Sequence, residues 1–335
     1  MKQIRVNLVS ESEFTVQGHG VHTAYLEMRH MLEKCPEVNL EVNASPNMCA
    51  DVTHIHTVGI FSLKRLLSNK GGKKIISGHI IPDSLIGSIA GAKFWLPIFK
   101  CYLRWFYNRA DAVIAVSPFT KQGLIKLGVK SDIVIINNTI DTALYHTTNE
   151  EKLKLRRKLN IGSDDFVVVG NGQVQPRKRF DSFVQVAKQL PNIKFIWVGG
   201  IPFKAAGADY LHLMHMIKTV PSNLTVTGVI ALERAREYMR AADVMFMPSI
   251  QETFGLAIIE GAASGLPVVV RDIPDYDATF GNQVWRGDDT TFAHQIQTLR
   301  DDAKTYRHWH NAALELAKKY DSSTTLQQLL DLYKK

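Results

Sequence analysis

Two glutamates eight positions apart, Glu252 and Glu260, are the residues of this chain whose spacing points most directly to chemistry. At 100° per residue, side chains eight apart on a helix are separated by about 80°, so both carboxylates can face one ligand. We predict that the helix opens after Glu252 and contains Glu260. The first backbone N–H groups lie at its positive end, where a phosphate is the expected guest, and belong to Phe254, Gly255 and Leu256. Taken alone, such a pair is more often two solvated acids on a surface helix.

A loop with three consecutive cations follows the predicted strand 166–170. It reads NGQVQPRKRF and places Arg177, Lys178 and Arg179 just before the next predicted helix. Cations in exposed loops are usually solvated. They become candidates for a site only through the sequence around them.

The first half of the chain offers two further candidates. A predicted strand, Ile4–Ser10, is followed by a loop containing Gly18 and Gly20 and then by a helical pattern. A strand, a glycine loop and a helix together bring backbone amides toward a phosphate, although a plain tight turn explains such a loop equally well. His79 ends the predicted strand 73–79, and ligands of doubly wound sheets sit outside the carboxyl ends of strands.

Strands and helices alternate along the whole chain, which predicts an α/β protein with two Rossmann-like, doubly wound domains facing a cleft. The 335 residues suffice for two domains. We expect an N-terminal domain over residues 1–148 and a C-terminal domain over 149–320. The last segment, 321–335, is expected to be a helix that crosses back to the first domain.

The residues from Pro248 to Val270, PSIQETFGLAIIEGAASGLPVVV, resemble the donor-site motif of family-4 glycosyltransferases, retaining enzymes of the two-domain GT-B fold. The resemblance is strong over residues 166–276 and looser before residue 150. In the first half, VSESEFTVQGHGVHTA, GHIIPDS and CYLRWFYN resemble bacterial glucosyl-diacylglycerol glucosyltransferases, which add a second hexose to monoglucosyl-diacylglycerol.

The resemblance implies roles for the candidate residues. Glu260 is expected to bind the ribose hydroxyls, and Glu252 and His79 the hydroxyls of the donor sugar. Lys178 matches the family lysine that holds the leaving diphosphate, while Gln173 replaces the family arginine, so that Arg177 or Arg179 must supply the second cation. The remaining donor contacts fall on the glycine loop, on the loop expected to touch the uracil and on the helix start, namely Gly18, Gly20, Gly228, Val229, Phe254, Gly255 and Leu256.

The resemblance further implies UDP-glucose or UDP-galactose as donor, no cofactor and no metal. His54 and His56 would point the same way on a strand and can in principle bind a metal. The family has a similar segment without one, so packing at a strand end is the better account. Without a carboxylate placed to attack, we favour front-face displacement, in which the leaving phosphate helps to deprotonate the acceptor, over a covalent intermediate.

Charge is concentrated in one part of the sequence. The chain has a net charge of +8, whereas residues 60–130 alone hold twelve Lys or Arg against two Asp, a net of +10. Such a window favours an anionic partner. Three cysteines without paired or metal-ligand spacing, an N-terminus without a signal-peptide core and the lack of a long apolar run predict a cytoplasmic protein.

The stretch 93–107 combines aromatic residues with cations at helical spacing. Such a helix can lie in a membrane interface on anionic lipid, but a buried aromatic stripe is an equally good account, and Pro97 is expected to begin the helix. We predict that the membrane-binding residues are Lys93, Trp95, Lys100, Arg104 and Trp105. The enzyme would then be peripheral on the inner face of the cell membrane, with a glycolipid acceptor.

Three rival readings remain open. A family-4 enzyme with a soluble or polysaccharide acceptor would keep the second domain unchanged and need no lipid. A sugar-nucleotide epimerase on the same fold would release UDP without any acceptor. A nucleic-acid-binding protein would explain the basic window but would leave the glutamate motif without a purpose, so we expect no nucleic-acid partner.

Overall fold

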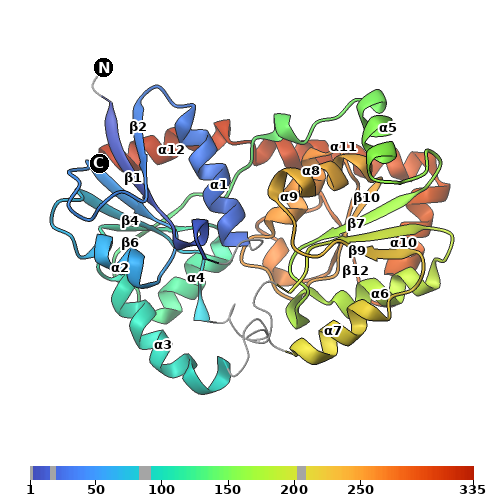
Figure 1. The fold of residues 1–335 in the computed structure, drawn as a ribbon, viewed down its shortest axis with the longest axis horizontal. Coiled ribbons are helices and arrows are strands. Elements are labelled where there is room, and N and C mark those ends of the chain that lie inside the picture. The colour runs from blue at the N-terminus through green and yellow to red at the C-terminus, as the bar shows by residue number, and fades with distance from the viewer. Residues whose placement is uncertain (1–2, 16–19, 83–91, 202–208) are drawn as a thin grey trace. The chain divides into compact units, whose positions relative to one another are not determined.

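The computed structural model describes residues 3–15, 20–82, 92–201 and 209–335, which form two compact units (Figure 1). Unit 1 contains the described residues up to Ile140 together with Ser322–Lys335, and unit 2 contains Asp141–Asp321. The chain therefore leaves unit 1 at residue 140 and returns to it at residue 322. Each unit has its own sheet and its own core.

Unit 1 is built on a six-stranded sheet in the order β2-β1-β3-β4-β5-β6, with every pair parallel. Its strands are β1 (Ile4–Val9), β2 (Val38–Val42), β3 (Val52–Ile55), β4 (Lys73–Ser77), β5 (Ala112–Ala115) and β6 (Asp132–Ile135). Its helices are α1 (Gly20–Glu33), α2 (Ile60–Leu66), α3 (Ala92–Tyr107), α4 (Pro118–Leu127) and α12 (Ser323–Lys334). A short 3-10 turn, η1 (Glu11–Glu13), follows β1.

The two faces of this sheet are covered by different helices. One core cluster joins α1 and α12 to β1, β2 and β3 through apolar residues such as Val6, Tyr25 and Leu329. The other joins α2, α3 and α4 to the opposite side through residues such as Ile76 and Phe106. The C-terminal helix α12 is thus part of the core of unit 1. This is expected because an amphipathic helix packs its apolar side against a core.

Unit 2 repeats the plan with the strand order β12-β11-β10-β7-β8-β9, again parallel throughout. Its strands are β7 (Val167–Asn171), β8 (Lys194–Val198), β9 (Leu224–Val226), β10 (Val244–Met247), β11 (Val268–Arg271) and β12 (Trp285–Gly287). Its helices are α5 (Asn149–Lys158), α6 (Phe180–Gln189), α7 (Tyr210–Lys218), α8 (Leu232–Ala241), α9 (Leu256–Ala263), α10 (Phe292–Asp301) and α11 (Ala303–Lys319). Figure 1 shows α6, α7 and α10 on one side of the sheet and α8, α9 and α11 on the other.

The predicted alternation of strands and helices is confirmed in both units. The strands β2 and β12 and the helices α2, α5 and α7 were not predicted from the sequence. The expectation that Pro97 begins a helix is wrong, because α3 starts at Ala92 and contains this proline. Pro97 removes one backbone hydrogen bond, to the carbonyl of residue 93 in the first turn, so little of the helix is lost.

Candidate active site

In the sheet of unit 2 the strand order reverses between β7 and β10. These strands are hydrogen-bonded neighbours, although 72 residues lie between the end of β7 and the start of β10. Ligands of doubly wound sheets bind at such a switch point, outside the carboxyl ends of the strands. The loop after β7 carries Lys178, and the loop after β10 carries Glu252. The topology therefore brings together two residues that are far apart in the sequence.

Lys178 and Glu252 form a buried ion pair in which the ammonium donates to Oε1 of the carboxylate. A second cation, Arg177, places Nη1 3.7 Å from Oε2 of Glu252. Burial acts to raise the pKa of Glu252, but Lys178 and Arg177 outweigh it and hold that pKa below its usual range. Burial lowers the pKa of Lys178, and Glu252 opposes the shift. Unpaired, either charge would be costly at this depth.

The two loops are tied to each other by the backbone. Ile250 N donates to the carbonyl of Arg177 at 2.9 Å, and Nη1 of Arg177 donates to the carbonyl of Gln251 at 3.2 Å. Arg179, by contrast, is engaged by Asp181 and Asp289 at 2.9 and 3.3 Å. Of the two arginines considered from the sequence, Arg177 therefore lies beside Lys178 and Glu252. Gln173 is half-buried in the turn.

Glu260 lies in the second turn of α9 and is also buried. Its Oε2 accepts a hydrogen bond from Nδ2 of Asn171 at 2.6 Å, and its Oε1 accepts one from the hydroxyl of Tyr145 at 3.4 Å. Both partners were missed in the sequence. Asn171 ends a strand and Tyr145 follows a 3-10 turn 115 positions before Glu260, so no local pattern connects them.

The start of α9 is shaped by Gly255, which has φ 84° and ψ 47° and caps the helix without a side-chain hydrogen bond. The left-handed conformation favours glycine. Phe254 is buried and packs edge-on against Tyr320 at 5.4 Å between ring centroids, and Leu256 is also buried. For these two residues, a role toward a ligand would therefore come from the backbone N–H groups, in keeping with the prediction.

Two more glycines, Gly199 and Gly228, have positive φ in loops beside the start of the cationic loop, and the first permits a close backbone approach. A Cβ on Gly199, whose φ is 135°, would lie 2.1 Å from the carbonyl oxygen of Gly172. That carbonyl accepts from Nε1 of Trp197 at 2.9 Å, which fixes the turn. Gly228, with φ 73°, forms an isolated bridge with Gly199, and Val229 beside it is 47% exposed. Gly228 and Val229 thus lie next to the loop that follows β8.

In unit 1 the corresponding switch point lies between β1 and β3. His79 follows β4, is buried, and its Nε2 lies 3.1 Å from Nδ1 of His56. Gly20 is the first residue of α1, and no atom that the structure describes beyond its chain neighbours and its own helix lies within 4 Å of the position of a Cβ there. Gly18 lies outside the described residues. Among the residues that the structure describes, no group of three or more His, Cys, Asp or Glu could hold a metal ion.

Helix α3 buries one side and leaves an apolar ridge on the other. Leu96, Leu103, Phe106 and Tyr107 are buried, whereas Phe94, Ile98 and Trp105 are 91%, 78% and 39% exposed. Together with exposed Cys101, the exposed residues follow an i, i+4, i+7, i+11 spacing, which defines one stripe of a helix. Exposed Lys100 and Arg104 flank this ridge. We call Phe94, Ile98, Cys101 and Trp105, with these two cations, the α3 ridge.

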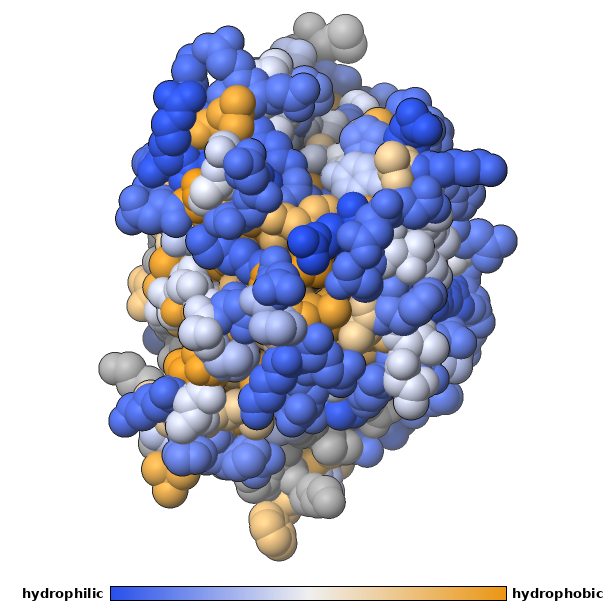
Figure 2. All heavy atoms as spheres, turned by 90° about the vertical axis from the view of Figure 1, so that its right-hand side faces the viewer, coloured by the Kyte–Doolittle hydropathy of each residue, from blue (hydrophilic) through white to orange (hydrophobic). Residues whose placement is uncertain are grey.

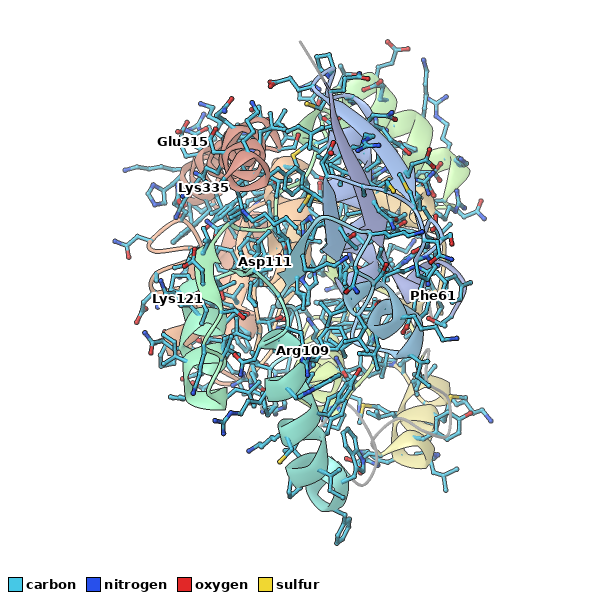
Figure 3. The ribbon with its side chains drawn as sticks, turned by 90° about the vertical axis from the view of Figure 1, so that its left-hand side faces the viewer. Phe61, Arg109, Asp111, Lys121, Glu315 and Lys335 are labelled. Carbon is cyan, nitrogen blue, oxygen red and sulfur yellow. The ribbon has the colours of Figure 1, made fainter. Side chains whose placement is uncertain are left out.

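The other predicted membrane residues lie elsewhere on the helix. Trp95 is half-buried and contacts Phe99 with ring centroids 5.4 Å apart, and Lys93 belongs to α3 but its side chain is not described. Figure 3 shows Arg109 just beyond the end of α3 and Lys121 on α4. The guanidinium of Arg109 lies 5.0 Å from the ring of Trp105, which extends the cationic side of the ridge.

The basic window of unit 1 is only partly on the surface. Of its eleven cations whose side chains are described, seven are exposed, namely Lys64, Lys70, Lys100, Arg104, Arg109, Lys126 and Lys130. Arg65 is buried and donates to the carbonyls of Ala44, Phe61 and Asn43, so it serves the fold. Figure 2 looks at the right-hand side of Figure 1, where unit 2 lies, and shows a mostly hydrophilic face with some apolar residues on it. No helix among the described residues is long and apolar enough to cross a bilayer.

Comparison with known proteins gives two family matches that together cover most of the chain. Residues 151–316 match the model described as glycosyl transferases group 1, and residues 18–144 match Glycosyltransferase Family 4. The alpha-galactosylglucosyldiacylglycerol synthase of Streptococcus pneumoniae is 32% identical over 100% of this chain and 90% of its own length. The processive diacylglycerol alpha-glucosyltransferase of Acholeplasma laidlawii is 29% identical over 82% of this chain and 80% of its own.

Solved structures give the same fold. Anabaena HepE in complex with UDP-glucose superposes with a TM-score of 0.76, covering 99% of this chain and all of that one, at 18% sequence identity. At this identity the likeness concerns the fold alone.

Proposed function

Because this chain belongs to Glycosyltransferase Family 4, we propose that it transfers a hexose, in the first place glucose, from a UDP-sugar to a membrane glycolipid such as monoglucosyl-diacylglycerol. The observation that carries the proposal is the full-length similarity to a synthase named for a glycosylated diacylglycerol. The α3 ridge supports it independently, since an acceptor anchored in a bilayer must be met at the bilayer surface.

The donor site is proposed to be the switch point of unit 2. Lys178 and Arg177 have the charge to hold a diphosphate, and the amides at the start of α9 add partial positive charge. Glu260 is held by Asn171 and Tyr145 in a position to accept hydrogen bonds from ribose hydroxyls. Lys178 must then shift part of its interaction from Glu252 to the phosphate, and Glu252 to hydroxyls of the donor sugar.

The transfer is proposed to proceed with retention and without a metal. The bond between the anomeric carbon and the phosphate oxygen breaks, and the acceptor oxygen bonds to the same face of that carbon. The acceptor proton passes to the leaving phosphate, so no protein base is required. Fixed cations beside the diphosphate stabilise the charge that develops in the transition state, and they need little reorganisation as it forms.

The acceptor side is proposed to be an anionic membrane surface contacted by the α3 ridge. Exposed Phe94, Ile98 and Trp105 can enter the headgroup region while Lys100 and Arg104 meet anionic lipid. Each cation near such a surface contributes about 1 kcal/mol. On this proposal the enzyme is peripheral on the inner face of the membrane and has no nucleic-acid partner.

A charge-reversal pair tests the membrane contact. We expect Lys100→Glu with Arg104→Glu to weaken sedimentation with anionic vesicles by about 10-fold or more and to lower turnover of vesicle-borne glycolipid accordingly. The matched control is Lys154→Glu with Lys318→Glu, which makes the same charge change on exposed cations of α5 and α11. Equal losses in both double variants would show that net charge alone is measured, and would count against a role for α3.

UDP release from UDP-glucose, with and without vesicles carrying monoglucosyl-diacylglycerol, tests the activity. We expect turnover to require both vesicles and glycolipid. Equal UDP release without lipid would overturn the glycolipid proposal and favour a soluble acceptor. Since the pneumococcal relative is named for a galactosyl addition, UDP-galactose is the second donor to assay beside UDP-glucose.

A further inference from the structure

Three imidazoles form a row through the sheet of unit 1. His54 lies in β3 and His56 directly follows that strand, with ring centroids 4.8 Å apart, and the ring of His56 lies 5.1 Å from that of His79. All three side chains are buried. The row begins at Tyr333 on α12, whose hydroxyl contacts Nδ1 of His54 at 2.7 Å, and it ends at His79, beyond the carboxyl end of β4.

The first two members of the row differ in their hydrogen bonds. Both ring nitrogens of His54 have hydroxyl partners, Tyr333 at Nδ1 and Ser77 at Nε2, at 2.7 and 2.8 Å. This pattern is complete and fits a structural residue. His56 has one hydrogen-bond partner for its ring among the described residues, which is Nε2 of His79, and its own Nε2 has none there. Among the described residues, His79 is therefore the hydrogen-bond partner of the His56 ring.

The contact between His56 and His79 also determines which ring nitrogens carry a proton. A neutral imidazole carries one N–H donor and one acceptor nitrogen, so one of the two facing nitrogens must be protonated and the other not. Choosing the proton at this contact chooses the tautomer of both rings, including which role Nδ1 of His79 can play. Burial and the neighbouring imidazoles hold the pKa of His56 well below its usual value, which keeps that ring neutral.

We propose that His56 is a positioning residue that holds His79 in one tautomer and one rotamer for its contact with the donor sugar. The inference rests on the proposed function and on the role that the family resemblance implies for His79, a contact with hydroxyls of the donor sugar. It adds a residue of unit 1 that contacts His79 and follows His54 by two positions, just after β3. A misplaced hydrogen-bonding group near a reacting carbon lowers rate more than affinity, so the expected loss is mainly in kcat.

Two substitutions separate positioning from packing. Asparagine carries its amide at the distance of Nδ1 from the backbone, so His56→Asn can keep the bond to His79. Glutamine reaches to the distance of Nε2, so His56→Gln loses it. In the full-length protein with UDP-glucose and vesicles of anionic lipid and monoglucosyl-diacylglycerol, we expect kcat to fall about 10-fold or more in His56→Gln, with KM for UDP-glucose little changed. In His56→Asn we expect kcat within about 3-fold of the wild type, since the bond is retained.

Tyr333→Phe is the structural control, because it removes the bond to His54 at the other end of the row. We expect it to lower Tm without changing kcat. A wild-type kcat in His56→Gln would overturn the inference. So would equal losses of kcat in His56→Asn and His56→Gln that follow their losses of Tm, because packing would then explain both.

A spectroscopic readout keeps the inference testable apart from the proposed function. Histidine labelled with nitrogen-15 reports the tautomer of each ring by NMR. We expect the His79 ring to show a single neutral tautomer in the wild type and in His56→Asn, and a mixture in His56→Gln. An unchanged His79 tautomer in His56→Gln contradicts the inference even if the wild type transfers no sugar, whereas an inactive wild type with the expected tautomers contradicts only the proposed function.

Discussion

At the scale of single residues, the proposed donor site contains charged side chains that are buried and paired with each other. Removing one member of a buried ion pair leaves the other uncompensated, at a cost of about 3–5 kcal/mol. Lys178 and Glu252 therefore stabilise each other in the free enzyme while remaining available to a ligand. A lysine-to-alanine change here combines lost stability with lost activity, so the neighbouring arginines are the sharper probes.

We predict that Arg177→Ala lowers kcat/KM by about 10-fold or more, because Arg177 lies beside Glu252 and Lys178. Arg179→Ala is the matched control: it loses its ion pairs to Asp181 and Asp289 and should leave kcat/KM close to the wild-type value. Steady-state kinetics with UDP-glucose measures kcat/KM for both variants. A larger loss in Arg179→Ala would assign the second cation to Arg179 instead.

We predict that Asn171 contributes to nucleotide binding. Asn171→Leu removes the 2.6 Å bond that orients Glu260, and we expect the Kd for UDP to rise about 10-fold. Calorimetric titration with UDP measures this. Asn223→Ala serves as control, since Asn223 donates to three backbone carbonyls of the same unit and its loss should lower Tm and leave UDP binding intact. Unchanged UDP binding in Asn171→Leu would contradict the role given to Asn171.

At the scale of elements, the C-terminal helix α12 packs into the core of unit 1. Leu329, Leu330, Leu332 and Tyr333 are buried in its core, and Lys73 donates to the carbonyl of Leu332 at 2.7 Å. The helix therefore contributes to the core of unit 1.

We predict that Leu329→Ala destabilises unit 1 by about 2–5 kcal/mol, the range for truncating a buried leucine. Gln328→Ala, on the exposed side of the same helix, should stay within about 0.5 kcal/mol of the wild type. Urea unfolding, followed by hydrogen exchange of amides in β1 and β3, gives both values. Similar stabilities of the two variants would mean that α12 does not complete this core.

Much of this architecture could be predicted from local pattern. Strands such as Val167–Asn171 and the helix containing Glu260 are signalled by apolar runs bounded by glycine. The glutamate motif and the cationic loop drew attention to Glu252 and Lys178, which form an ion pair in the structure. The remainder depends on contacts between distant segments. The hydrogen bonds of Glu260 to Asn171 and Tyr145 follow from strand order, and the short elements β12 and α2 have too few residues for a periodic signal.

For α3, the sequence pattern could not show which aromatic side chains are buried and which are exposed. Its aromatics predicted either a membrane face or a core face, and the helix divides them: Phe106 and Tyr107 are buried, whereas Phe94 and Trp105 are exposed. Helical spacing gives the angle between residues. It does not give the rotation of the helix on its sheet, which depends on packing against α2 and α4.

At the scale of the whole molecule, the two units should differ in their response to acid. Burial lowers the pKa of His54 to about 3, with a smaller contribution from His79, whereas a histidine in the unfolded chain titrates near its ordinary value. Between those values the unfolded state binds the proton and the folded state does not, so stability falls as pH falls below about 6.5. At pH 5 this single group removes about 2 kcal/mol.

We therefore predict that unit 1 loses stability between pH 7 and pH 5 faster than unit 2. Hydrogen exchange at both pH values, resolved by unit, measures the difference. His54→Asn keeps an amide near Tyr333 but cannot take up a proton, so it should reduce the pH dependence of unit 1. An equal pH dependence in His54→Asn and wild type would show that other groups control the acid response.

The lipid product is the direct test of whether the enzyme moves a hexose to a glycolipid with retention. Purified enzyme is incubated with UDP-glucose and anionic vesicles carrying monoglucosyl-diacylglycerol, and the extracted lipid is examined by mass spectrometry and by NMR of its anomeric protons. We expect one added hexose in α linkage, and its loss in Glu252→Gln. A lipid fraction without added hexose would rule out the transfer, and a hexose in β linkage would rule out retention.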